Sequence, residues 1–128
     1  MEINCSKKNY STFESIRRTF SNTKSISKLD ISFNKIRFLP SNLSGFVNLT
    51  SLDLRGNPLH NYNSIVEGLK SLPKLQELWV DLIEISEENE NFRHLLENIP
   101  KLQFVNGEEV THMRLKFMRE SGHRSRVD

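Results

Sequence analysis

Leucine and other large apolar residues recur along this chain at a fixed set of positions. From Leu49 to Leu59 the sequence follows the pattern LxxLxLxxNxL, in which x is any residue. The same frame can be placed at Ile26, Leu49, Leu75 and Leu102, and these starts lie 23, 26 and 27 residues apart. A fixed period of roughly 20–50 residues indicates stacked structural units that share one continuous core.

The positions of this frame, numbered one to eleven, divide into core and turn positions. Apolar residues occupy positions one, four, six and eleven, whereas position nine is Asn34, then Asn57, then Ile83. An asparagine amide can bond the backbone of a turn, so Asn34 and Asn57 should form a ladder that Ile83 interrupts. The expected core residues are Ile26, Leu29, Ile31, Ile36, Leu49, Leu52, Leu54, Leu59, Leu75, Leu78, Val80, Ile83, Ile85, Leu102 and Val105.

The segments that link the units differ in their expected structure. Apolar residues at helical spacing predict helices within 13–20, 61–73 and 90–98. The segment 37–48 is short and holds Pro40 and Gly45, which favours a 3₁₀ turn or an extended chain.

Both ends of the chain depart from the regular frame. Residues 1–10 predict an edge strand and a turn, in which Cys5 is a small buried apolar residue and not a reactive thiol. The segment 111–128 predicts a helix that packs Met113 and Phe117 against the last unit, with Leu115 as a further candidate, then a polar, basic and frayed end after Gly122.

This frame resembles the leucine-rich repeat family, whose repeats span roughly 20–29 residues. The resemblance covers Glu2 to Val110. In short intracellular members a Leu-x-x-Leu-Asp-Gly-x-x-Val segment closes the core as a C-terminal cap. Val105, Asn106 and Gly107 stand here in place of Leu-Asp-Gly. The resemblance implies an α/β fold: a right-handed solenoid with a short parallel sheet on its concave side and helices or 3₁₀ turns on its convex side.

We expect a single domain over residues 1–128, in keeping with the length of the chain. Residues 1–25 would form an N-terminal cap unit, 26–101 the repeats, and 102–128 a C-terminal cap with a basic tail. The resemblance implies a module that binds a protein partner on its concave face, as a scaffold or regulatory subunit.

Residues between the core positions should project from the sheet and offer the candidate binding surface. Trp79, the one tryptophan, falls at position five, and tryptophan and arginine are enriched at binding hot spots. The alternative is that Trp79 only shields its neighbours or lies under the C-terminal tail. The predicted partner-binding residues are Lys28, Asp30, Phe33, Asp53, Arg55, Glu77, Trp79, Asp81 and Phe104.

The distribution of charged residues suggests a second hypothesis, which is that the protein binds nucleic acid. The net charge is only +2, but residues 1–40 carry eight Lys and Arg against three Asp and Glu, and residues 41–100 carry four against nine. A protein that binds RNA or a ribonucleoprotein could use the basic segments at the two ends, although aromatic residues are not interleaved with them in the sequence. These basic residues are Lys7, Lys8, Arg17, Arg18, Lys24, Lys28, Arg114, Lys116, Arg119, Arg124 and Arg126.

Motifs for catalysis, phosphate binding and metal binding are absent from the sequence, so we expect no enzyme, cofactor or metal. The cluster of Glu84, Glu87, Glu88 and Glu90 is interpreted as a solvated face and the start of a helix. A single cysteine, no apolar N-terminal segment and no apolar run of 18 residues favour a cytoplasmic or nuclear protein without a membrane partner.

Overall fold

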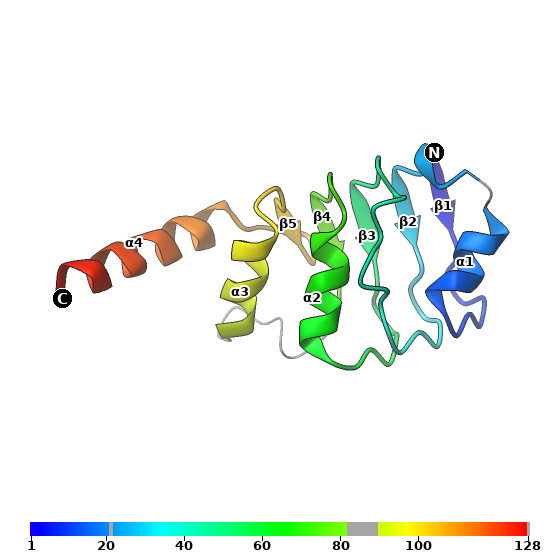
Figure 1. Cartoon of the computed structure of the whole chain (residues 1–128), viewed down its shortest axis with the longest axis horizontal. Coiled ribbons are helices and arrows are strands. Elements are labelled where there is room, and N and C mark those ends of the chain that lie inside the picture. The colour runs from blue at the N-terminus through cyan, green and yellow to red at the C-terminus, as the bar shows by residue number, and fades with distance from the viewer. Residues whose placement is uncertain (21, 82–89, 128) are drawn as a thin grey trace.

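A computed structural model of the chain describes residues 1–20, 22–81 and 90–127, with side chains as far as residue 120. In this part of the chain six short strands form one sheet in sequence order, parallel from the first to the fifth and antiparallel at the last pair (Figure 1). The strands are β1 (Glu2–Asn4), β2 (Lys28–Asp30), β3 (Ser51–Asp53), β4 (Glu77–Trp79), β5 (Phe104–Val105) and β6 (Glu108–Glu109).

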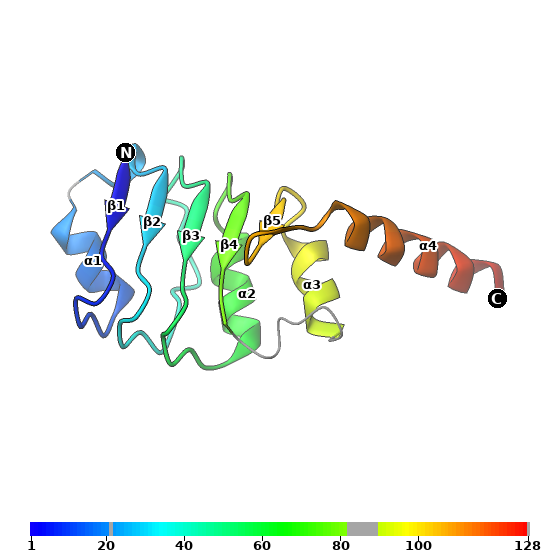
Figure 2. The ribbon, with the colours of Figure 1, turned by 180° about the vertical axis from the view of Figure 1, so that it is seen from behind.

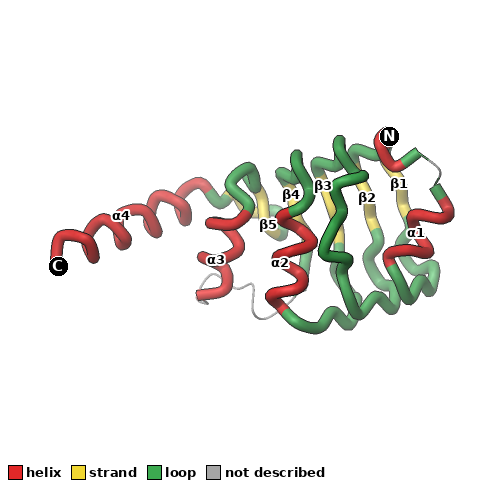
Figure 3. The backbone as a smooth tube through the Cα atoms, viewed as in Figure 1, coloured by secondary structure: helices red, strands yellow, loops and turns green. Residues whose placement is uncertain are grey.

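The linking segments lie on one face of this sheet, and the strands of the other face are seen uncovered from behind (Figures 2 and 3). They contain α1 (Phe13–Thr19), the 3₁₀ turn η1 (Thr23–Ser25), α2 (Tyr62–Lys70) and α3 (Glu90–Asn98). The link after β2 contains no helix, as Pro40 and Gly45 predict. Gly68 of α2 packs against this link, because a Cβ there would lie 2.5 Å from the carbonyl oxygen of Pro40.

The core lies between the sheet and the linking layer. At positions one, four and six of the three central units, every side chain is at most 2% exposed, which confirms the register of the frame. Those nine residues are Ile26, Leu29, Ile31, Leu49, Leu52, Leu54, Leu75, Leu78 and Val80. Ile83 and Ile85 lie outside the described residues, so their places in the core remain predictions.

The asparagine ladder is present in the turns after β2 and β3, where both side chains are buried. The Asn34 amide nitrogen donates to the carbonyl of Cys5 at 2.9 Å, and that of Asn57 donates to the carbonyl of Ile31 at 3.0 Å. Each amide therefore bonds the backbone of the preceding unit as well as its own turn. The ladder satisfies polar groups of the turns that strand pairing does not reach.

The C-terminal end differs from the expectation in three respects. The closing segment is a hairpin of β5 and β6, and Asn106 and Gly107 at its tip have positive φ values of 53° and 83°. Leu115 is 53% exposed, so it does not pack against the last unit. The helix α4 (Thr111–Val127) also continues through Gly122, where the sequence predicted a frayed end. It projects away from the sheet (Figures 1 and 2).

Candidate interaction surface

Side chains at equivalent positions of successive units form rows across the open face of the sheet. The strand register confirms two rows that the frame predicts. At position three the row is Glu2, Lys28, Ser51, Glu77 and Phe104. At position five the row is Asn4, Asp30, Asp53 and Trp79.

Neighbours in the position-three row bond one another in pairs. Lys28 Nζ lies 3.3 Å from Glu2 Oε1, and Ser51 Oγ donates to Glu77 Oε1 at 2.7 Å. Phe104 ends the row with 38% of its surface exposed. At one end of this row the charges of Glu2 and Lys28 offset each other. At the other end the Glu77 carboxylate lies beside the Phe104 ring.

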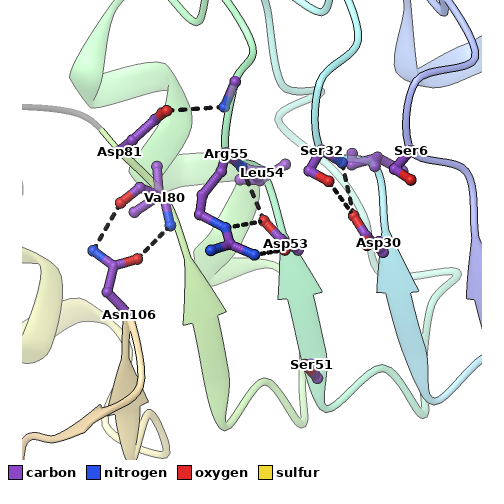
Figure 4. A network of polar contacts seen from close by, with 12 residues as sticks. Ser6, Asp30, Ser32, Ser51, Asp53, Leu54, Arg55, Val80, Asp81 and Asn106 are labelled. Carbon is purple, nitrogen blue, oxygen red and sulfur yellow. Dashed lines mark hydrogen bonds and ion pairs between the residues drawn. The ribbon is translucent and has the colours of Figure 1, made fainter.

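The polar residues of the position-five row also have a structural role that the sequence reasoning missed. In each of the first three units the side-chain oxygen accepts a hydrogen bond from the backbone N–H two residues later. Figure 4 shows the second and third of these. Such Asx turns give a hydrogen-bond partner to a backbone N–H just after a strand ends. The Asn or Asp at the end of each of the first three strands is the signal that could have predicted them. The pairs are Asn4 with Ser6, Asp30 with Ser32 and Asp53 with Arg55, at 2.9 to 3.1 Å.

Trp79 replaces the Asx residue in the fourth unit and is only partly exposed. The Arg55 guanidinium lies 4.6 Å from the centre of its ring. Two nitrogens of Arg55 donate to the Asp53 carboxylate at 3.0 and 2.7 Å, and this hydrogen bonding raises the pKa of Arg55. On the hairpin side, a Cβ at Gly107 would lie 3.0 Å from the Trp79 ring. The ring thus lies between an arginine held by Asp53 and the hairpin tip, and these contacts are the kind that the shielding alternative predicts.

The hairpin contributes a second residue that sequence reasoning did not assign correctly. Asn106 was expected to project from the sheet at position five, but its side chain bonds the backbone of Val80 (Figure 4). Its Oδ1 accepts from the Val80 N–H and its Nδ2 donates to the Val80 carbonyl, both at 2.8 Å. One side-chain amide therefore takes the place of a peptide group where β5 ends.

The segment 11–59, which runs from α1 through the third unit's turn, matches a family model described as leucine-rich repeat. This segment belongs to the leucine-rich repeat family. Comparison with curated proteins gives no match. Leucine-rich repeat domains generally mediate contacts between proteins and typically carry no catalytic activity.

The nine residues predicted to bind a partner do not all lie together on this leucine-rich repeat sheet. Six stand on strands in the two rows, and Arg55 and Asp81 each lie two residues beyond the end of a strand. Asp81 Oδ2 accepts a hydrogen bond from the N–H of Gly56 at 2.9 Å, which ties the fourth unit's turn to the third. Phe33 lies apart, in the turn after β2, with its ring against Gly56.

A hollow of about 400 Å³ is lined by residues of β1, β2 and β3 and by Trp79 of β4. Asp30, Asp53 and Trp79 line one side of it, and Glu2 and Lys28 line another. Within residues 1–20, 22–81 and 90–120, neither Asp30 nor Glu77 pairs with a cationic side chain. The face therefore offers an aromatic ring, a fixed cation and carboxylates beside a concavity.

Several cations named for the RNA hypothesis are used inside the molecule. Arg114 donates to the carbonyls of Leu96, Ile99 and Leu102 at 2.5, 2.8 and 2.7 Å, and its burial lowers its pKa. It caps the C-terminal end of α3 and holds α4 in place. Arg17 similarly donates to the carbonyl of Asn42 at 2.6 Å. Side chains beyond residue 120, including Arg124 and Arg126, lie outside the described part.

Binding chemistry of other kinds finds little support in the described part of the chain. No group of three His, Cys, Asp or Glu side chains there is placed to hold a metal ion. Burial raises the pKa of the Cys5 thiol, which keeps it protonated and weakly nucleophilic at neutral pH. Within the same residues, none of the helices combines the length and the apolar character needed to span a bilayer.

Proposed function

We propose that this leucine-rich repeat protein is a non-catalytic scaffold or regulatory subunit that binds a protein partner on the open face of its sheet. The stacked units would form a right-handed solenoid whose concave side is this face. We also propose a cytoplasmic or nuclear location, since the sequence holds a single cysteine and therefore no disulfide framework of the kind found in small secreted domains.

The arrangement of Trp79, Arg55 and Asp53 carries this proposal. Tryptophan and arginine contribute most to binding when they sit at the centre of a contact surface. Arg55 is already held by Asp53 and stacked on Trp79, so little side-chain entropy is lost when a partner binds. Phe104 and the hollow beside Asp30 extend the same surface on either side.

The proposal is tested by crosslinking and affinity purification from the native cell, followed by titration of the recovered partner with purified variants. Trp79→Ala should weaken binding by about 30-fold, equivalent to about 2 kcal/mol, because a central aromatic contact is lost. Arg55→Ala should weaken it by a comparable factor, since it removes the stacked cation.

Phe38→Ala is the matched control, because this exposed aromatic residue lies in the link after β2 and not on the sheet face. Its affinity should equal that of the wild type. Circular dichroism and thermal melting must show that all three variants fold. Equal affinity of Trp79→Ala and wild type would exclude the sheet face as the binding site.

A further inference from the structure

The turns after the first three strands lie side by side and form one edge of the molecule, the lower edge in Figure 1. We call the segments 5–10, 31–38 and 56–62 the turn edge. Backbone hydrogen bonds join them: Lys35 N–H donates to the Tyr10 carbonyl and His60 N–H to the Arg37 carbonyl, both at 2.8 Å. These three segments contain no Asp or Glu.

The turn edge is strongly basic and its cations are free to meet an anion. Lys7, Lys8, Lys35 and Arg37 are all exposed. None of the four forms an ion pair with a carboxylate in the described part of the chain. The equivalent segment of the fourth unit, 81–89, is acidic in sequence, so the basic character ends with the third turn.

Phe33 places an aromatic ring among these cations at a cost in backbone free energy. It is 55% exposed and has a φ of 56°, a region that bulky residues rarely adopt. The equivalent residue of the next turn is Gly56, with a φ of 73°, which shows that the position itself requires this conformation. The ring lies on Gly56, where a Cβ would come within 2.4 Å, and Lys7 Nζ lies 6.0 Å from its centre.

A second exposed ring stands five residues further along the same turn. Phe38 is 64% exposed, and its ring is tilted against that of His60 at 6.0 Å between centres. Neither ring belongs to the core, since the inward positions of this turn are taken by Ile36 and Leu39. The turn edge therefore carries two exposed apolar rings on the same segment as Lys35 and Arg37, with Lys7 close to the first ring.

We propose that the turn edge binds a single-stranded nucleic acid, with its phosphates on Lys7, Lys8, Lys35 and Arg37 and its bases stacked on Phe33 and Phe38. Cations that follow a backbone combined with aromatic platforms are the arrangement that binds single strands with little sequence preference. An acidic peptide would use the cations but would offer no flat bases to the two rings. The site is separate from the sheet face, and it shares only Lys7 and Lys8 with the basic ends considered above.

The test is fluorescence anisotropy of labelled oligouridylate and oligoadenylate of about 12 nucleotides, a length within the usual site size, with the full chain. Binding should be measurable at about 50 mM salt and fall about 50-fold at about 200 mM, as contacts to four phosphates predict. Lys7→Glu combined with Lys35→Glu should abolish it, whereas Lys74→Glu with Lys101→Glu, away from the turn edge, should reduce it much less.

Phe33→Gly separates stacking from folding, because glycine adopts the required backbone conformation without strain. This variant should melt at the same temperature as wild type or higher, yet bind the oligonucleotide about 10-fold more weakly. Phe38→Ala should reduce the affinity for the oligonucleotide by a similar factor. Trp79→Ala should bind the oligonucleotide normally, so failure here and failure of the sheet-face proposal are distinguishable.

Three results would overturn the proposal. They are no binding at about 50 mM salt, unchanged affinity of both phenylalanine variants, and competition by polyglutamate as effective as competition by unlabelled oligonucleotide. The last result would assign the turn edge to an acidic protein segment instead.

Discussion

Asn57 and Asn106 perform the same task at two different places in the stack. Each donates its side-chain amide to the carbonyl at a strand end of the preceding unit, Asn57 to Ile31 at 3.0 Å and Asn106 to Val80 at 2.8 Å. Asn57 is buried at position nine of its frame, whereas Asn106 is exposed at position five of the closing hairpin. The comparison shows that an asparagine is needed wherever a backbone carbonyl just beyond a strand lacks a donor. The asparagine that meets this need does not always stand at the same position of the repeat.

The difference between the two asparagines comes from the path of the chain. In the third unit the backbone continues past the strand, so a side chain four residues later reaches back. In the last unit the backbone turns away at Asn106, with a φ of 53°, so no further peptide group is available and the side chain itself completes the sheet. The Asn106 amide thereby closes the end of a structure that would otherwise expose unpaired groups.

The largest loss of unfolding free energy is expected from a substitution in the core of the third unit. The losses expected from the two asparagine variants are compared with it. Leu54→Ala should lower the free energy of unfolding by about 2–5 kcal/mol, because this fully buried side chain would leave a cavity. Urea denaturation measures the change. A loss below about 1 kcal/mol would mean that the units pack more loosely than their burial indicates.

Asn57→Ala should cost about 3 kcal/mol, since it leaves the N–H of Ile36 and the carbonyls of Ile31 and Leu54 without this partner inside the core. Asn57→Asp is the informative companion: it keeps an acceptor for Ile36 but places a carboxylate against two carbonyls. A melting temperature for either variant equal to that of wild type would contradict the ladder.

Asn106→Ala should cost only about 1 kcal/mol, because water can replace the two hydrogen bonds at this exposed site. Hydrogen exchange should show faster exchange at the Val80 amide, while the Ile31 amide in the interior of the sheet stays protected. A destabilisation as large as that of Asn57→Ala would show that the closing amide and the interior amide are energetically equivalent.

The smallest effect is expected where the fourth unit departs from its neighbours. Trp79→Asn restores the Asx residue found at position five in the first three units. We expect a change in unfolding free energy of about 1 kcal/mol or less, since the lost contacts with Arg55 and Gly107 are partly offset by a new Asx turn. A loss of several kcal/mol in a thermal melt would make Trp79 a structural residue and weaken its proposed role in binding.

The repeating pattern alone predicted most of the regular part of the molecule. Apolar residues at fixed spacing determined which side chains face the core, and Pro40 and Pro100 limited where helices form. The two rows across the sheet followed, because side chains of a strand alternate between its faces. The helix α3 ends at the predicted residue, Asn98.

The two ends and the polar contacts were decided only by tertiary structure. The dipeptide Asn106-Gly107 favours a tight hairpin, but its place in the sheet depends on a preceding strand that the local sequence does not specify. Arg114 was counted as a surface charge, and its role became visible only when α4 met the end of α3. Likewise, Lys7, Phe33 and Gly56 are far apart in the chain and meet only because the turns stack.

The sequence by itself therefore determined the repeat, the buried positions and the rows of side chains that face outward, because these follow from the local periodicity of a strand and a turn. Tertiary structure decided which carbonyl each amide meets, which arginine is internal and which rings share an edge. Those contacts join residues that are 12 or more positions apart, as between Arg114 and Leu102 or between Asn106 and Val80. No local pattern encodes which distant group will be left needing a partner.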